Sequence, residues 1–165
     1  MAIPAEIPLT EEGYAALQLE LAHLKQVERP KVITEIADAR AHGDLKENAE
    51  YHAAREKQGF VEARIADLED KLIRVKVITI DVTNADVVRF GAYVTVSEEI
   101  SGESKTYRIV GDLEADISKS KISLSSPIAR ALIGKKVDDL VSVSAPKGTM
   151  EYLVTHISYT PLTGA

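Results

Sequence analysis

Eight positions between residues 51 and 75 repeat at alternating spacings of three and four. They are Tyr51, Ala54, Gln58, Val61, Ile65, Leu68, Leu72 and Val75, and only Gln58 among them is polar. The residues between them are mostly charged. A narrow apolar seam with solvated flanks is typical of a helix that packs against a single partner helix. The spacing therefore predicts a helix over residues 46–76 in a two-helix coiled coil.

The preceding residues supply the partner helix. The same spacing is found at Tyr14, Leu17, Leu21 and Leu24. Thr10 is a good N-cap for this helix. Pro30 interrupts its apolar register, and we expect the helix to kink or reset there. Helices over residues 10–41 and 46–76, joined by the short break at residues 42–44, predict an antiparallel hairpin with arms about 45 Å long.

Residues 77–165 have a different composition, rich in Val, Ile, Thr and Ser, with six of the nine glycines. Short apolar runs separated by turn residues predict strands, and Ser126-Pro127 predicts the start of one short helix. We expect an antiparallel β-sheet with that helix. The chain is thus predicted to be α+β, with a coiled-coil hairpin over residues 1–76 and a sheet domain over residues 77–165.

Charge and composition exclude several classes of protein. The chain has 20 Lys and Arg against 26 Asp and Glu, a net charge of −6, which argues against broad, salt-driven nucleic-acid binding. Cysteine is absent, so a disulfide framework, a zinc ribbon and a thiol nucleophile are excluded. No apolar run approaches the roughly 20 residues that span a bilayer, and the N-terminus has no signal-peptide pattern. We expect a cytoplasmic protein without a membrane partner.

The turn of the hairpin carries two acidic residues, Asp44 and Glu47, one helical turn apart. One interpretation is a capping box, with Asp44 as the N-cap and Glu47 at the third helical position. The other is that both carboxylates share a hard cation such as Mg²⁺, for which a partner must supply the remaining ligands. The two interpretations are compatible, and the sequence leaves both open.

Basic residues lie just behind this turn. Arg40 precedes it, and a turn near residue 43 would place Lys31 opposite Arg55 and Arg29 opposite Lys57. These side chains could contact phosphates, or they could be ordinary surface charge paired with nearby Glu residues. No P-loop, H-E-x-x-H or Ser-His-Asp order accompanies them, so the sequence contains no self-contained active site.

Residues 39–52, ARAHGDLKENAEYH, resemble the signature of the Gre family of bacterial transcript cleavage factors, most closely its GreA members. The similarity continues through residues 90–92, 107–111, 114–116, 126–129 and 132–135. The resemblance implies that residues 77–165 form an FKBP-like domain that docks on RNA polymerase. It also implies that the hairpin enters the secondary channel of the polymerase and brings its tip to the active centre.

The resemblance further assigns roles to single residues. Asp44 and Glu47 match the acidic tip residues, which hold a Mg²⁺ jointly with the polymerase while the polymerase cleaves backtracked RNA near its 3′ end. Arg40 and Arg55 match basic positions that contact the extruded RNA. The chain would then be a monomeric cofactor, not an enzyme, with no metal stably bound on its own. The alternatives are a Gre-like secondary-channel inhibitor and an FKBP-like prolyl isomerase or chaperone.

Overall fold

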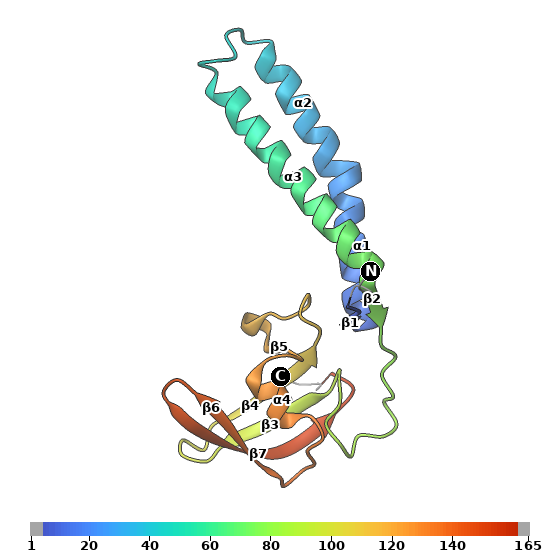
Figure 1. The fold of residues 1–165 in the computed structure, drawn as a ribbon, viewed down its shortest axis with the longest axis vertical. Helices are drawn as coiled ribbons and strands as arrows, with labels where there is room; N and C mark the ends of the chain where they lie inside the picture. The colour runs from blue at the N-terminus through green and yellow to red at the C-terminus, as the bar shows by residue number, and fades with distance from the viewer. Residues whose placement is uncertain (1–4, 162–165) are drawn as a thin grey trace. The chain divides into compact units, whose positions relative to one another are not determined.

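The computed structural model describes residues 5–161 and divides into two compact units. Residues 14–75 form a long helical hairpin, and the second unit contains a β-sheet with a short helix (Figure 1). This arrangement confirms the predicted α+β class. The second unit begins at Lys76 but also includes residues 7–13. The division into domains of 1–76 and 77–165 remains a prediction, and its outermost residues lie outside the described range.

The first arm of the hairpin consists of α1 (Glu11–His23), a π-helical turn η1 (Leu24–Glu28) and α2 (Arg29–Arg40). The backbone N–H of Arg29 donates to the carbonyl of Leu24, five residues earlier. Pro30 follows in the first turn of α2 and has no N–H to donate to the preceding turn. The expected reset of the register at Pro30 therefore takes the form of a wider turn immediately before it.

The second arm is α3 (Ala49–Arg74), which lies along α2 (Figure 1). Its buried residues are Ala54, Val61, Ile65 and Leu68, which are all seam positions. The other four predicted seam positions are half-buried. On the facing arm, Val32 and Ile36 pack into the same apolar cluster. The predicted coiled-coil seam is confirmed, and among the described residues no helix is both long and apolar enough to cross a membrane.

Ion pairs flank this seam and define its register. Arg29 Nε lies 2.7 Å from Glu62 Oε1, and Lys57 Nζ lies 3.2 Å from Glu35 Oε1. The expectation that Arg29 faces Lys57 is therefore wrong. The loop between the arms is longer than the sequence predicted, so each residue of α2 meets a later residue of α3.

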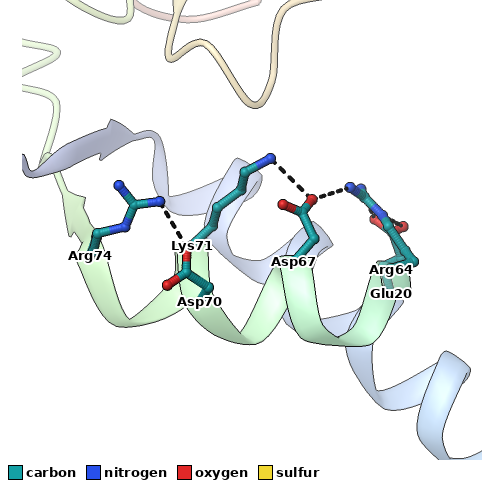
Figure 2. A network of polar contacts seen from close by, with 6 residues as sticks. All are labelled: Glu20, Arg64, Asp67, Asp70, Lys71 and Arg74. Atoms are coloured by element: carbon teal, nitrogen blue, oxygen red, sulfur yellow. Dashed lines mark hydrogen bonds and ion pairs between the residues drawn. The ribbon is translucent and has the colours of Figure 1, made fainter. Parts of the chain in front are cut away.

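Near the end of α3, a network of polar contacts joins the two arms (Figure 2). Arg64 Nε lies 2.7 Å from Glu20 Oε1 of α1, and its Nη1 lies 3.2 Å from Asp67. Asp67 also accepts a hydrogen bond from Lys71 Nζ at 3.0 Å. The hydrogen bond from Lys71, with the nearby positive charges, lowers the pKa of the Asp67 carboxyl below its ordinary 3.8.

A carboxyl with a lowered pKa stabilises the folded state above its unfolded pKa, and the contribution is lost as the pH falls through the folded value. We therefore expect Asp67→Asn to lower the melting temperature slightly at pH 7. The difference from the unsubstituted chain should shrink below pH 3.8. Melting curves between pH 7 and pH 2.5 at low salt test this expectation. A constant difference at every pH would mean that Asp67 acts through packing and not through charge.

The sheet of the second unit has the strand order β5-β4-β3-β7-β6. Its elements are β3 (Tyr93–Glu98), β4 (Ser104–Val110), η2 (Ile117–Lys119), β5 (Lys121–Ser123), α4 (Pro127–Leu132), β6 (Leu140–Ala145) and β7 (Gly148–Ser158). All neighbours are antiparallel except β4 and β5, which are parallel. The sheet is mixed because the connection through residues 111–120 is long enough to return the chain and start β5 beside β4.

The segment before α1 belongs to this second unit. Strand β1 (Ile7–Leu9) pairs with β2 (Val75–Val77). Thr10 is fully buried, and its Oγ1 accepts a hydrogen bond from Gly13 N–H at 3.0 Å, which confirms the predicted N-cap. The Glu114 carboxylate accepts hydrogen bonds from Thr10 N–H at 3.1 Å, from the Thr10 hydroxyl and from Gly111 N–H at 3.0 Å. Glu114 therefore anchors the first turn of α1 within the second unit.

Candidate functional site

The loop at the end of the hairpin spans residues 41–48, between the end of α2 and the start of α3 (Figure 1). Asp44 and Glu47 both lie in this loop, and both side chains are exposed. Gly43 has a φ of +105°, a conformation that residues with a Cβ rarely adopt, and its place is next to open solvent. The glycine thus allows the chain to leave α2 and present the acidic residues at the tip.

The structure does not support the capping-box interpretation of Asp44 and Glu47. The N-cap of α3 is Asn48, whose side chain accepts a hydrogen bond from Tyr51 N–H at 3.1 Å. Asp44 Oδ1 instead accepts from Lys46 N–H at 3.1 Å, a turn inside the loop. Both acidic residues precede the helix because α3 begins at Ala49 and not at residue 46.

The two carboxylates keep oxygen atoms available for a ligand. Glu47 makes no hydrogen bond or ion pair with any residue from 5 to 161, and Asp44 uses one oxygen for Lys46 N–H. Both line a shallow depression of about 360 Å³, together with His42, Asn48, Ala49 and Glu50. Carboxylate oxygens are the ligands that Mg²⁺ prefers. Within the described residues no group of three or more His, Cys, Asp or Glu could hold a metal, so this pair fits only part of a coordination shell.

The predicted RNA-contacting residues lie beside the loop. Arg40 is the last residue of α2, and its guanidinium carbon lies 5.8 Å from the centroid of the Tyr51 ring, within the range of a cation–π contact. Arg55 is exposed on α3 and has no hydrogen bond or ion pair with a described residue. Arg29 and Lys57, by contrast, are paired with carboxylates. Neither Arg40 nor Arg55 is therefore paired with a carboxylate in the part of the chain that the structure describes.

Two further residues, Asn48 and His52, hold this loop in place. Asn48 Nδ2 donates a hydrogen bond to the carbonyl of Ala39 at 2.7 Å. His52 Nε2 lies 3.0 Å from the carbonyl oxygen of Lys46. An asparagine directly before a helical pattern is a known N-cap signal, and it could have identified Asn48. The contacts with Ala39 and Lys46 have no such signal because they depend on the folded loop.

Comparisons with known proteins match both parts of the chain. The N-terminal model of the GreA/GreB transcription elongation factors matches residues 7–77, and the C-terminal model matches residues 83–159. Transcription elongation factor GreA of Hyphomonas neptunium is 54% identical over 153 residues, 93% of this chain and 98% of that protein. GreA of Rickettsia bellii is 52% identical over 158 residues, 96% and 98% of the two chains. The solved GreA factor homolog 1 (Gfh1) of Thermus thermophilus is 29% identical, with a TM-score of 0.42 over 92% of this chain and 98% of that one.

Proposed function

The chain belongs to the GreA family of transcription elongation factors, and from this premise we propose that it stimulates transcript cleavage by bacterial RNA polymerase. The hairpin tip enters the secondary channel and reaches a backtracked complex, where the polymerase cleaves the extruded RNA and resumes elongation. The observation that carries the proposal is the exposure of Asp44 and Glu47 in the loop at the end of the hairpin, with no cationic side chain of residues 5–161 paired to either.

The chemistry at the tip follows from the groups that the chain presents. Asp44 and Glu47 would hold a Mg²⁺ jointly with the polymerase, and a metal in that position activates water and stabilises charge on a phosphoryl oxygen. The guanidiniums of Arg40 and Arg55 would bind phosphates of the extruded RNA 3′ end through charge-assisted hydrogen bonds. Because the remaining metal ligands must come from the polymerase, the chain acts as a cofactor and not as an enzyme.

The sheet domain is proposed to be the part that docks on the polymerase. We assign docking on the polymerase to residues 77–165 and insertion into the secondary channel to residues 1–76. The support is that the sheet has its own apolar core, which includes Val94, Ile109, Leu132 and Val154. A domain with an independent core can bind a partner on its own. We propose that a single copy of the chain acts in this way, in the cytoplasm.

Two other functions are less well supported. A secondary-channel inhibitor would share the architecture but alter the tip, whereas Asp44 and Glu47 are both present and exposed here. A prolyl isomerase needs a pocket that is mostly apolar and aromatic. A cavity of about 170 Å³ in the second unit does not have such a lining, because Glu11, Glu12 and Arg108 line it together with three aliphatic residues and one aromatic, Tyr159.

The proposed function is tested with stalled, backtracked elongation complexes that carry labelled RNA. Addition of the protein should release short 3′ fragments and restore elongation, and the protein without polymerase should leave the same RNA intact. Cleavage by the protein alone would contradict the cofactor role. Unchanged cleavage in the presence of the protein would contradict the proposed function as a whole.

The role of Arg55 is tested by Arg55→Ala. We expect about a tenfold loss of cleavage stimulation at limiting protein, which corresponds to about 1.4 kcal/mol, the size of one hydrogen bond to a charged group. The melting temperature should not change, because Arg55 is exposed and contacts no described carboxylate. Arg55→Lys keeps the charge but not the forked geometry of the guanidinium. Its cleavage stimulation should lie between that of Arg55→Ala and that of the unsubstituted chain. An unchanged cleavage rate for Arg55→Ala would mean that Arg55 does not contact the RNA and is an ordinary surface residue.

A further inference from the structure

The side chain of Asn48 contacts both helices at the end of the hairpin. Its Oδ1 accepts a hydrogen bond from Tyr51 N–H in the first turn of α3 at 3.1 Å. Its Nδ2 donates to the Ala39 carbonyl in the last turn of α2 at 2.7 Å. The Ala39 carbonyl also accepts from His42 N–H at 3.2 Å, at the C-terminal end of α2 where carbonyls lack helical partners. One amide therefore pairs with a backbone donor at the start of one helix and with a backbone acceptor at the end of the other.

These two hydrogen bonds close a loop that contains residues 40–47 and so includes both acidic residues of the tip. A loop of this length has many conformations when only its ends are fixed, and each ordered residue costs conformational entropy. We propose that Asn48 is a positioning residue, whose amide holds the loop in the conformation that presents Asp44 and Glu47 together. This inference rests on the proposed function, because it assigns the loop geometry to transcript cleavage.

Further contacts inside the loop point the same way. The carbonyl oxygen of Lys46 lies 3.0 Å from His52 Nε2, and the N–H of Lys46 donates to Asp44 Oδ1 at 3.1 Å. Glu47 lies between Lys46 and Asn48, and both of these neighbours are tethered. The backbone of Glu47 is thus held on both sides, while its carboxylate has no partner among the described residues. A fixed backbone with a free carboxylate is what a ligand for another protein's metal requires.

The two atoms of the Asn48 amide can be separated by substitution. Asn48→Asp keeps an oxygen that accepts from Tyr51 N–H, and aspartate is as good an N-cap as asparagine. It loses the donor and places a second acceptor against the Ala39 carbonyl. Asn48→Ser also keeps an N-cap oxygen, adds no charge and is too short to reach Ala39. Both variants therefore preserve the start of α3 and remove the link between the helices.

We expect both variants to lower the maximal rate of stimulated cleavage at saturating protein by about tenfold, since a misplacement of about 1 Å can cost up to about 100-fold. The protein concentration that gives half the maximal rate should stay within about twofold, because docking is unchanged. Their melting temperatures should stay near that of the unsubstituted chain. Asn48→Ser adds no charge, so a loss that both variants share does not arise from the charge that Asn48→Asp adds.

A second measurement needs no polymerase. Hydrogen exchange at the amides of His42 and Lys46, which are hydrogen-bonded in the loop, should be several-fold faster in Asn48→Ser. Amides in the middle of α3 should be unaffected. Unchanged exchange would overturn the proposal even if the unsubstituted chain failed to stimulate cleavage, which would contradict the proposed function separately. Maximal rates equal to those of the unsubstituted chain in both Asn48 variants would also overturn it, whatever the exchange rates show.

Discussion

The double variant Asp44→Asn, Glu47→Gln is expected to lose stimulated cleavage. Its rate at saturating protein should fall by a factor of about 100 or more. A metal ligand at a reacting phosphate contributes several kcal/mol of transition-state stabilisation, and about 2.7 kcal/mol corresponds to 100-fold. The amides keep the size of the side chains but remove both negative charges. Cleavage of backtracked complexes over a range of protein and Mg²⁺ concentrations measures the loss.

The fold should survive this change. Both side chains are exposed, and an asparagine oxygen at position 44 can still accept from Lys46 N–H. The matched control is Glu50→Gln, because Glu50 lines the same depression but lies on α3, 4.0 Å from His42. We expect that variant to keep most of the stimulation. Full activity in the double variant would contradict the proposed role of Asp44 and Glu47. An equal loss in Glu50→Gln would mean that stimulation depends on the total negative charge of the tip and not on these two carboxylates.

The hairpin could be predicted from the sequence because its pattern is local and repeated. The buried positions of α3 recur at the spacing of one helix face, whereas in a strand they would not all lie on one side. They are Ala54, Val61, Ile65 and Leu68. The start of α3 could not be predicted in the same way. Asp44 and Asn48 are equally good N-caps, and Glu47 completes a capping box with the first of them. The hydrogen bond from Asn48 to Ala39, across the hairpin, distinguishes the two in the folded chain.

The same distinction explains which parts of the candidate site were predicted. Asp44 and Glu47 were identified because two acids at a turn form a visible pattern, and the structure places both in the tip loop. Their roles in cleavage remain proposals. The partner of Arg29 across the hairpin is Glu62 and not Lys57, because the register of the two arms depends on the length of the loop. The sequence pattern predicted a loop that was too short. Long-range contacts, such as that of Thr10 with Glu114, have no local signal at all.

Gly111→Ala is expected to destabilise the second unit by about 3 kcal/mol, near the upper end of the usual cost of overpacking. A Cβ at Gly111 would lie 2.0 Å from the backbone carbonyl oxygen of Pro8, and a backbone atom cannot move aside as a flexible side chain can. The added methyl group would push β1 away from the Gly111 backbone. It would also disturb the hydrogen bonds that Glu114 accepts from Gly111 and Thr10. Denaturant unfolding followed by circular dichroism measures the loss.

The control for this change is Gly59→Ala in α3. A Cβ at Gly59 meets nothing within 4 Å, and alanine is a better helix former than glycine. That variant should therefore gain up to about 1 kcal/mol. Opposite signs for the same glycine-to-alanine change would show that the cost at Gly111 arises from its contact with Pro8. If Gly111→Ala unfolded at the same denaturant concentration as the unsubstituted chain, residues 7–13 could not be packed against the sheet unit as the structure has them.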